Sequence, residues 1–93
     1  RLEIVIEQPL AQRMAKLLVE LEAPGYTLLD HAGGRGDRGL RRAEEPTGTS
    51  TNCLFIVACE DQASATRIVE GIRPVLSRSG GICLVSDALW VRH

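Results

Sequence analysis

The sequence predicts an α+β domain in which a four-stranded antiparallel sheet carries two helices on one face. Two observations lead to this fold class. Four short segments with strand-like apolar patterns are separated by two amphipathic stretches, in the order strand, helix, strand, strand, helix, strand. A long polar stretch, residues 33–52, separates the two halves, and the total of 93 residues fits one domain.

The first half of the chain predicts a strand, a helix and a second strand. Leu2–Glu7 alternates apolar and polar residues, as a half-buried strand does. The apolar residues of Leu10–Glu22 follow at helical spacing, directly after a proline suited to a first helical turn. Pro24 ends this helix, and Tyr26–Ala32 begins with residues that favour strands.

The second half repeats the pattern without an evident sequence repeat. Cys53–Cys59 is a continuous apolar run that predicts a buried strand. Asp61 is placed to cap a second helix, which we expect Pro74 to kink or shorten. Ser77–Gly81 predicts a loop, and Ile82–Val91 predicts the last strand.

This order is the split βαβ, or ferredoxin-like, arrangement. Its two helices cover one face of the sheet, whereas the third strand is apolar on both sides. Leu54 and Ile56 alternate there with Phe55 and Val57. A large apolar face left in water usually marks an interface. The sequence therefore predicts an oligomer that packs through its open sheet faces.

Composition restricts the classes of function. The formal net charge of -1 argues against a general nucleic-acid binder, which would be clearly basic. No apolar run reaches the roughly 18 residues of a membrane span, so we expect no membrane insertion. Cys53, Cys59 and Cys83 lie in apolar runs without CxxC spacing, which favours reduced cysteines in a cytoplasmic protein.

The polar stretch 33–52 contains the clearest candidate chemistry. Arg35, Arg38, Arg41 and Arg42 are interspersed with glycines. Guanidinium groups bind phosphate through paired hydrogen bonds, and glycines let backbone N–H groups approach an anion. A solvated loop whose charges bind nothing explains the spacing equally well.

Other positions carry weaker signals. The turn Ser79–Gly81 could offer backbone donors to a phosphate, although an ordinary turn is the simpler interpretation. Arg92 could add a positive charge, although a frayed terminus explains it as well. His31 has no neighbours at metal-ligand or catalytic spacing, so we predict neither a metal site nor a catalytic residue.

Taken together, these segments resemble the PII signalling family. Gly25–Leu29 and Gly33–Arg38 are similar to the second strand of that family and the start of its long T-loop. Thr51–Phe55 is similar to its return strand, and Gly80–Cys83 to its second nucleotide-contacting loop and final strand. The run Gly33–Arg41 is most similar to the PII-like branch linked to inorganic carbon. That branch includes the regulator of bicarbonate transporters and the carboxysome-associated PII-like protein.

The resemblance implies a single domain over residues 1–93, with 33–52 as the T-loop. It implies a non-catalytic homotrimer that binds an adenine nucleotide between subunits: ADP, AMP or cyclic AMP, with bicarbonate as a further ligand. The T-loop would report ligand binding to a protein partner, either a transporter or an enzyme of carbon metabolism. The implied location is the bacterial cytoplasm. If the chain resembles the carboxysome-associated member of the branch, it would lie at carboxysomes. No lysine follows Gly80 and Gly81, which favours these ligands over ATP.

The resemblance also implies roles for individual residues. Arg38 and Arg41 would bind the phosphates, while Thr27 and the backbone at Gly33 and Gly34 would line the adenine end. Gly80 and Gly81 would donate backbone hydrogen bonds to phosphate, and Arg92 would add a cation. The implied nucleotide-binding set is Thr27, Gly33, Gly34, Arg35, Arg38, Arg41, Gly80, Gly81 and Arg92.

Two alternatives share the same order of elements. An enzyme acting on a phosphate ester or acyl phosphate would need a glycine-bearing cradle after the first strand, where this chain has Glu7-Gln8-Pro9. An RNA-binding module would need exposed aromatic side chains on the central strands. Only Phe55 lies inside the third strand, so this alternative is the weaker one.

Overall fold

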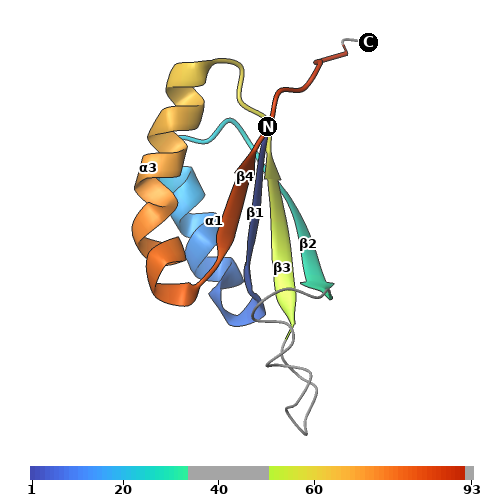
Figure 1. Ribbon diagram of the computed structural model, residues 1–93, viewed down its shortest axis with the longest axis vertical. Coiled ribbons are helices and arrows are strands. Elements are labelled where there is room, and N and C mark those ends of the chain that lie inside the picture. The colour runs from blue at the N-terminus through green and yellow to red at the C-terminus, as the bar shows by residue number, and fades with distance from the viewer. Residues whose placement is uncertain (34–50, 92–93) are drawn as a thin grey trace, which may run out of the picture.

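The computed structural model describes residues 1–33 and 51–91 (Figure 1). Their alternating and helical apolar patterns produce four strands, two α-helices and one short 3-10 helix. Along the chain these are β1 (Leu2–Glu7), η1 (Gln8–Leu10), α1 (Ala11–Glu20), β2 (Thr27–Ala32), β3 (Asn52–Val57), α3 (Gln62–Ser79) and β4 (Ile82–Val85).

The four strands form one antiparallel sheet in the order β2-β3-β1-β4. Both α-helices lie on the same face of this sheet, and the other face is open (Figure 1). The described chain therefore has the expected ferredoxin-like α+β fold. None of its helices in the described ranges is long and apolar enough to cross a membrane.

The core lies between the helices and the inner face of the central strands. β1 and β3 bury every second residue, so each gives one full row of side chains to the core. Helices α1 and α3 cover these rows with one apolar stripe each. The fully buried larger side chains are Leu2, Ile4, Ile6, Met14, Leu18, Cys53, Phe55, Val57, Ile68 and Ile72.

Helix α3 begins as the sequence predicts and ends later than predicted. The Asp61 carboxylate accepts a hydrogen bond from the backbone N–H of Ser64 at 2.8 Å, which confirms the N-cap. Pro74 does not shorten the helix, which runs on to Ser79. The carbonyl that loses its partner to Pro74 belongs to Glu70, and both residues are exposed, so water can satisfy it. The loop predicted over 77–81 is thus largely the last helical turn.

Two predicted strands extend past the observed C-terminal ends. β3 ends at Val57, two residues before the expected end, and β4 ends at Val85 instead of Val91. Register explains the second difference. β4 pairs with β1 only as far as Leu2, and the last backbone bonds join Arg1 to Ser86 at 2.7 and 2.9 Å. No described strand lies alongside 87–91, so these residues leave the sheet.

The open face carries a continuous apolar row. Leu29 of β2 lies opposite Leu54 of β3, Leu54 lies opposite Val5 of β1, and Val5 lies opposite Ile82 of β4. Leu29 and Ile82 are each about half exposed, at 49% and 52%. One chain therefore exposes an apolar row that crosses all four strands, as the apolar alternation on both sides of the strands indicated.

Candidate functional site

The structure describes four of the nine predicted nucleotide-binding residues. Gly34, Arg35, Arg38, Arg41 and Arg92 lie outside the described residues. Of the other four, Thr27 begins β2 and Gly33 follows its end, while Gly80 and Gly81 form the connection from α3 to β4.

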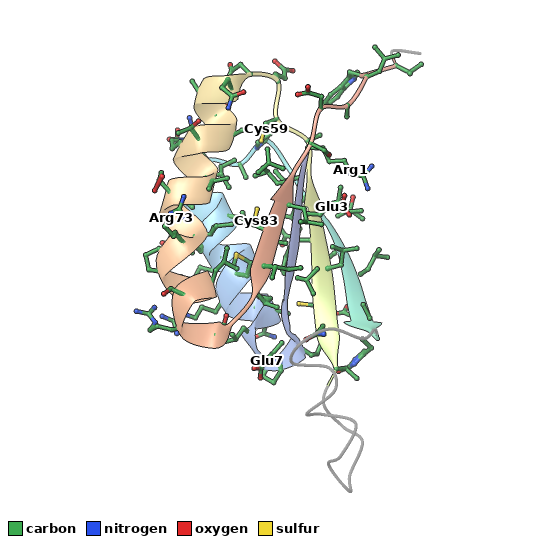
Figure 2. All side chains as sticks on the ribbon, in the orientation of Figure 1. Arg1, Glu3, Glu7, Cys59, Arg73 and Cys83 are labelled. Atoms are coloured by element: carbon green, nitrogen blue, oxygen red, sulfur yellow. The ribbon has the colours of Figure 1, made fainter. Side chains whose placement is uncertain are left out.

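Gly33 and Gly81 lie at the same end of the sheet, Gly33 at the β2 edge and Gly81 at the β4 edge. Ala32 pairs with Asn52, which pairs with Glu7, and Ile82 lies beside Val5, so all four strands have an end in this region. Glu7 marks this end of β1 in Figure 2. Since β3 and β1 separate β2 from β4, the two edges are roughly 14 Å apart at normal strand spacing. One chain therefore does not bring the two glycine segments together.

The turn at Gly80 is a tight helix ending. Gly80 adopts a left-handed conformation with φ 74°, and its N–H donates to the carbonyl of Leu76 at 2.8 Å. The N–H of Gly81 donates to the hydroxyl of Ser79 at 3.3 Å. In the structure, both glycine amides therefore donate within the chain, so they would have to exchange these bonds to bind a phosphate.

Thr27 lies away from Gly33. It is exposed on the open face of β2, opposite Ile56, at the end of the strand remote from Gly33. At the usual rise per residue the two positions are roughly 20 Å apart. Within one chain, Thr27 and Gly33 can therefore contact only different parts of an extended ligand.

One residue that the sequence reasoning missed joins the strands near Gly33. The side-chain amide of Gln8 donates to the Asp30 carboxylate at 2.7 Å, and its oxygen accepts from the backbone N–H of His31 at 2.7 Å. The backbone N–H of Gln8 donates to the carbonyl of Thr51 at 2.9 Å. We call these three bonds the Gln8 clamp. They span more than 20 positions of sequence, so no local pattern signals them.

The Gln8 clamp lies at an irregularity of the sheet. The pairing of β2 with β3 shifts between Leu29 and Ala32, and His31 has φ 54°, in the left-handed region. The shift takes the N–H of His31 out of the regular ladder, and Gln8 provides its acceptor. The Thr51 hydroxyl also lies 3.5 Å from Nδ1 of His31. Gln8 thereby links the end of β2, just before Gly33, to the residue that opens the return to β3.

Two cysteine thiols among the described residues have raised pKa values. Burial, followed by the nearby Asp30 carboxylate, raises the pKa of the Cys53 thiol, and burial raises the pKa of Cys83. Both thiols are therefore held in the protonated, unreactive form. Figure 2 shows Cys83 and Cys59 as separate side chains. No group of three His, Cys, Asp or Glu residues in the described ranges could hold a metal ion.

The structure also contains a groove that is not lined by Thr27, Gly33, Gly80 or Gly81, the four predicted site residues that the structure describes. It has a volume of about 760 Å³ and lies between the start of α3 and the segment after β4. Three apolar residues of that segment are strongly exposed: Leu89, Trp90 and Val91. The groove is at the end of the sheet opposite Gly33 and Gly81.

The sequence profile of the family described as nitrogen regulatory protein P-II matches residues 1–93. The chain belongs to the P-II family. Solved structures of PII-like proteins are similar to it over most of both chains. The fold described above, two helices on a four-stranded antiparallel sheet, agrees with this membership.

The similar solved structures include proteins from two organisms, Thiomonas intermedia and Thermus thermophilus. CPII, a nitrogen regulatory PII-like protein from Thiomonas intermedia K12, was solved bound to ADP, AMP and bicarbonate; it is 21% identical, with a TM-score of 0.68, covering 89% of this chain and 78% of that chain. CPII bound to ADP and bicarbonate is 23% identical, with a TM-score of 0.70 and the same coverage. A PII-like signalling protein from Thermus thermophilus is 25% identical, with a TM-score of 0.62, covering 89% and 77%.

Proposed function

We propose that this P-II family chain is a non-catalytic regulatory protein that binds an adenine nucleotide at the boundaries between subunits of a homotrimer. The observation that carries the proposal is the placement of Gly33 and Gly81 at one end of the sheet but on opposite edges. A site that uses both segments needs the β2 edge of one subunit beside the β4 edge of the next. Head-to-tail contacts of this kind form a ring when the rotation from one subunit to the next closes on itself.

The open sheet face supports the assembly. The row formed by Leu29, Leu54, Val5 and Ile82 is the apolar surface that such a ring would cover. Subunits arranged with these faces inward would bring unlike sheet edges together at each boundary. The same contact would thus bury apolar area and complete the binding site.

The ligands we propose are ADP and AMP, with cyclic AMP as a further candidate and bicarbonate as a second ligand. CPII, with the same fold, was solved with ADP, AMP and bicarbonate. The short connection through Gly80 and Gly81 supports a preference for few phosphates, because both amides already donate within the chain and no lysine follows them. Arg38 and Arg41 are the proposed phosphate ligands, with Arg35 and Arg92 as further cations.

The regulatory part of the proposal concerns residues 33–52. A nucleotide bound at the start of this T-loop would favour one of its conformations, and a protein partner would bind that conformation. The partner we propose is a transporter or enzyme of inorganic carbon metabolism in bacteria, at the carboxysome or elsewhere in the cytoplasm. This follows the PII-like branch that the run Gly33–Arg41 resembles.

The two alternative functions receive less support. The residues after β1 form the 3-10 helix Gln8–Leu10, and the Gln8 side chain is engaged by Asp30 and His31, so no phosphate cradle is formed there. Phe55 is fully buried, with its ring 5.3 Å from that of Tyr26, so it cannot stack on an RNA base.

Calorimetric titration tests the proposal. ADP, AMP, ATP and cyclic AMP are titrated into the protein with and without bicarbonate. We expect ADP or AMP to bind most tightly, and Arg38→Ala to weaken the binding roughly tenfold or more, as loss of charge-assisted phosphate bonds does. Arg13→Ala, at an exposed position on α1, is the control and should leave affinity unchanged. Affinities no better than about millimolar for all four nucleotides would refute the proposal.

A further inference from the structure

The Gln8 clamp provides an inference about how the proposed site is positioned. Gln8 is the first residue after β1, and its three hydrogen bonds reach β2 and the residue directly before β3. We propose that Gln8 is a positioning residue, which fixes Gly33 and Thr51 relative to β1 and thereby sets the affinity for nucleotide. The effect on nucleotide affinity rests on the proposed function. The positioning of the backbone by Gln8 does not depend on it.

The positions of the hydrogen bonds support this role. Two of them hold consecutive residues, Asp30 and His31, at the point where the pairing of β2 with β3 is irregular. Only Ala32 pairs with β3 beyond this point, so the ladder alone gives little hold on Gly33. The third bond holds Thr51, directly before β3. Gln8 therefore reinforces the sheet on both sides of the segment 34–50.

Energetics favour a specific role over general packing. Gln8 is only partly buried, whereas the core beneath it is formed by apolar side chains of β1, β3 and the helices. The bond from Gln8 to Asp30 is the strongest kind in the clamp, because its acceptor is a charged carboxylate. A change at Gln8 should thus move the backbone at His31 and Thr51 more than it affects the core.

A pair of substitutions tests the clamp with little change in size. Gln8→Glu keeps an acceptor for the N–H of His31 but places a carboxylate against Asp30, at the position of the 2.7 Å bond. Adding Asp30→Asn reverses the donor and acceptor and restores both side-chain bonds. Gln12→Glu introduces the same charge at an exposed position of α1 and is the matched control.

Two readouts are measured on each variant. Amide hydrogen exchange at His31 reports the clamp itself, and calorimetric titration with ADP and AMP reports binding. Repulsion between the carboxylates at positions 8 and 30 should move the side chain at position 8 away from Asp30 and from the N–H of His31. We therefore expect Gln8→Glu to speed His31 exchange and weaken nucleotide binding, each roughly tenfold, the scale of one to two lost hydrogen bonds. The double variant should restore both values, and Gln12→Glu should change neither.

The possible outcomes separate this inference from the proposed function. Wild-type affinity in Gln8→Glu, or a double variant as weak as the single one, would overturn the positioning role. Unchanged His31 exchange in Gln8→Glu would overturn the clamp even if the protein binds no nucleotide. A wild-type protein that shows the exchange pattern but binds no nucleotide would refute the proposed function and the binding half of this inference, while supporting the clamp.

Discussion

Gly81 lies directly against Val5: a Cβ atom built on Gly81 would stand 2.8 Å from the carbonyl oxygen of Val5. The same Cβ would stand 2.5 Å from Cγ2 of Ile6. The start of β4 can therefore reach its place beside β1 only because residue 81 has no side chain. This close approach fixes the β4 edge, where the proposed site is completed by a second subunit.

Gly81→Ala should therefore destabilise the fold. The backbone carbonyl of Val5 cannot move aside cheaply, so we expect a loss of about 1–3 kcal/mol in the free energy of unfolding, measured by urea denaturation. Gly25→Ala is the control, since nothing lies within 4 Å of its Cβ position. An alanine at 25 should be neutral or stabilise by up to about 1 kcal/mol. Equal effects of the two substitutions would contradict this account of Gly81.

Glu22 occupies a position that favours glycine. It has φ 60° and follows Leu21, the C-cap of α1. The N–H of Glu22 donates to the carbonyl of Val19 and the N–H of Ala23 to that of Leu18, both at 3.0 Å, which is a Schellman-type ending. We predict that Glu22→Gly stabilises the protein by about 0.5–1 kcal/mol in thermal or urea unfolding. Lys16→Gly, at an exposed position inside the helix, should instead destabilise by about 1 kcal/mol. The prediction fails if both changes have the same sign.

Arg67 connects α3 to the end of α1. Its guanidinium donates to the carbonyl oxygens of Leu21 at 3.1 Å and Glu22 at 3.4 Å, which have no partner within the helix. Arg67→Ala should lower the free energy of unfolding by about 1–2 kcal/mol. Arg73→Ala removes only the exposed ion pair with Glu70, so it should cost at most about 0.5 kcal/mol. If Arg73→Ala lowered the free energy of unfolding more than Arg67→Ala does, this account of Arg67 would be contradicted.

The buried thiols predict a pH dependence. Because burial raises the pKa of Cys53, the folded protein holds this thiol protonated at a pH where the unfolded chain ionises it. The resulting contribution to stability is full below the ordinary thiol pKa and is lost as pH rises toward the raised value. We expect iodoacetamide to label Cys53 and Cys83 far more slowly in the native protein than in urea at about pH 8. Labelling of native Cys53 at the unfolded rate would refute this.

The apolar row on the open face predicts a dependence of assembly on single residues. Leu29→Asp places a carboxylate in this row at a side chain that is 49% exposed in one chain, so folding should tolerate it. We expect the variant to be monomeric by size-exclusion chromatography with light scattering, and to lose nucleotide binding. Val19→Asp makes the same change on α1 at a side chain that is 68% exposed and should leave the assembly intact. The opposite pattern would place the interface on the helices.

Most of the fold follows from periodicity alone. Alternation in Leu2–Glu7 and the helical spacing of apolar residues after Pro9 are direct consequences of strand and helix geometry. The predicted ends of α3 and β4 are wrong, because tertiary structure overrides the local sequence preference at these positions. Pro74 is tolerated because its face of α3 is exposed, and β4 is paired with β1 only from Ile82 to Val85.

The site was less accessible to sequence reasoning. The glycine-rich sequence marks Gly80 and Gly81 as a turn. It does not show that their N–H groups donate to Leu76 and Ser79, which only the folded structure reveals. Gln8 carries no motif, since its partners lie in strands brought together only by the fold. The roles of Arg35, Arg38, Arg41 and Arg92 remain predictions, because these residues lie outside the described ranges.

Native mass spectrometry with ADP tests the central claim most directly, because it counts subunits and ligands in one experiment. A site formed between the β2 edge of one subunit and the β4 edge of the next predicts an assembly of three chains that carries up to three ADP molecules, and no ADP on single chains. Single chains that bind ADP, or a trimer that binds none, would contradict a nucleotide site shared between subunits.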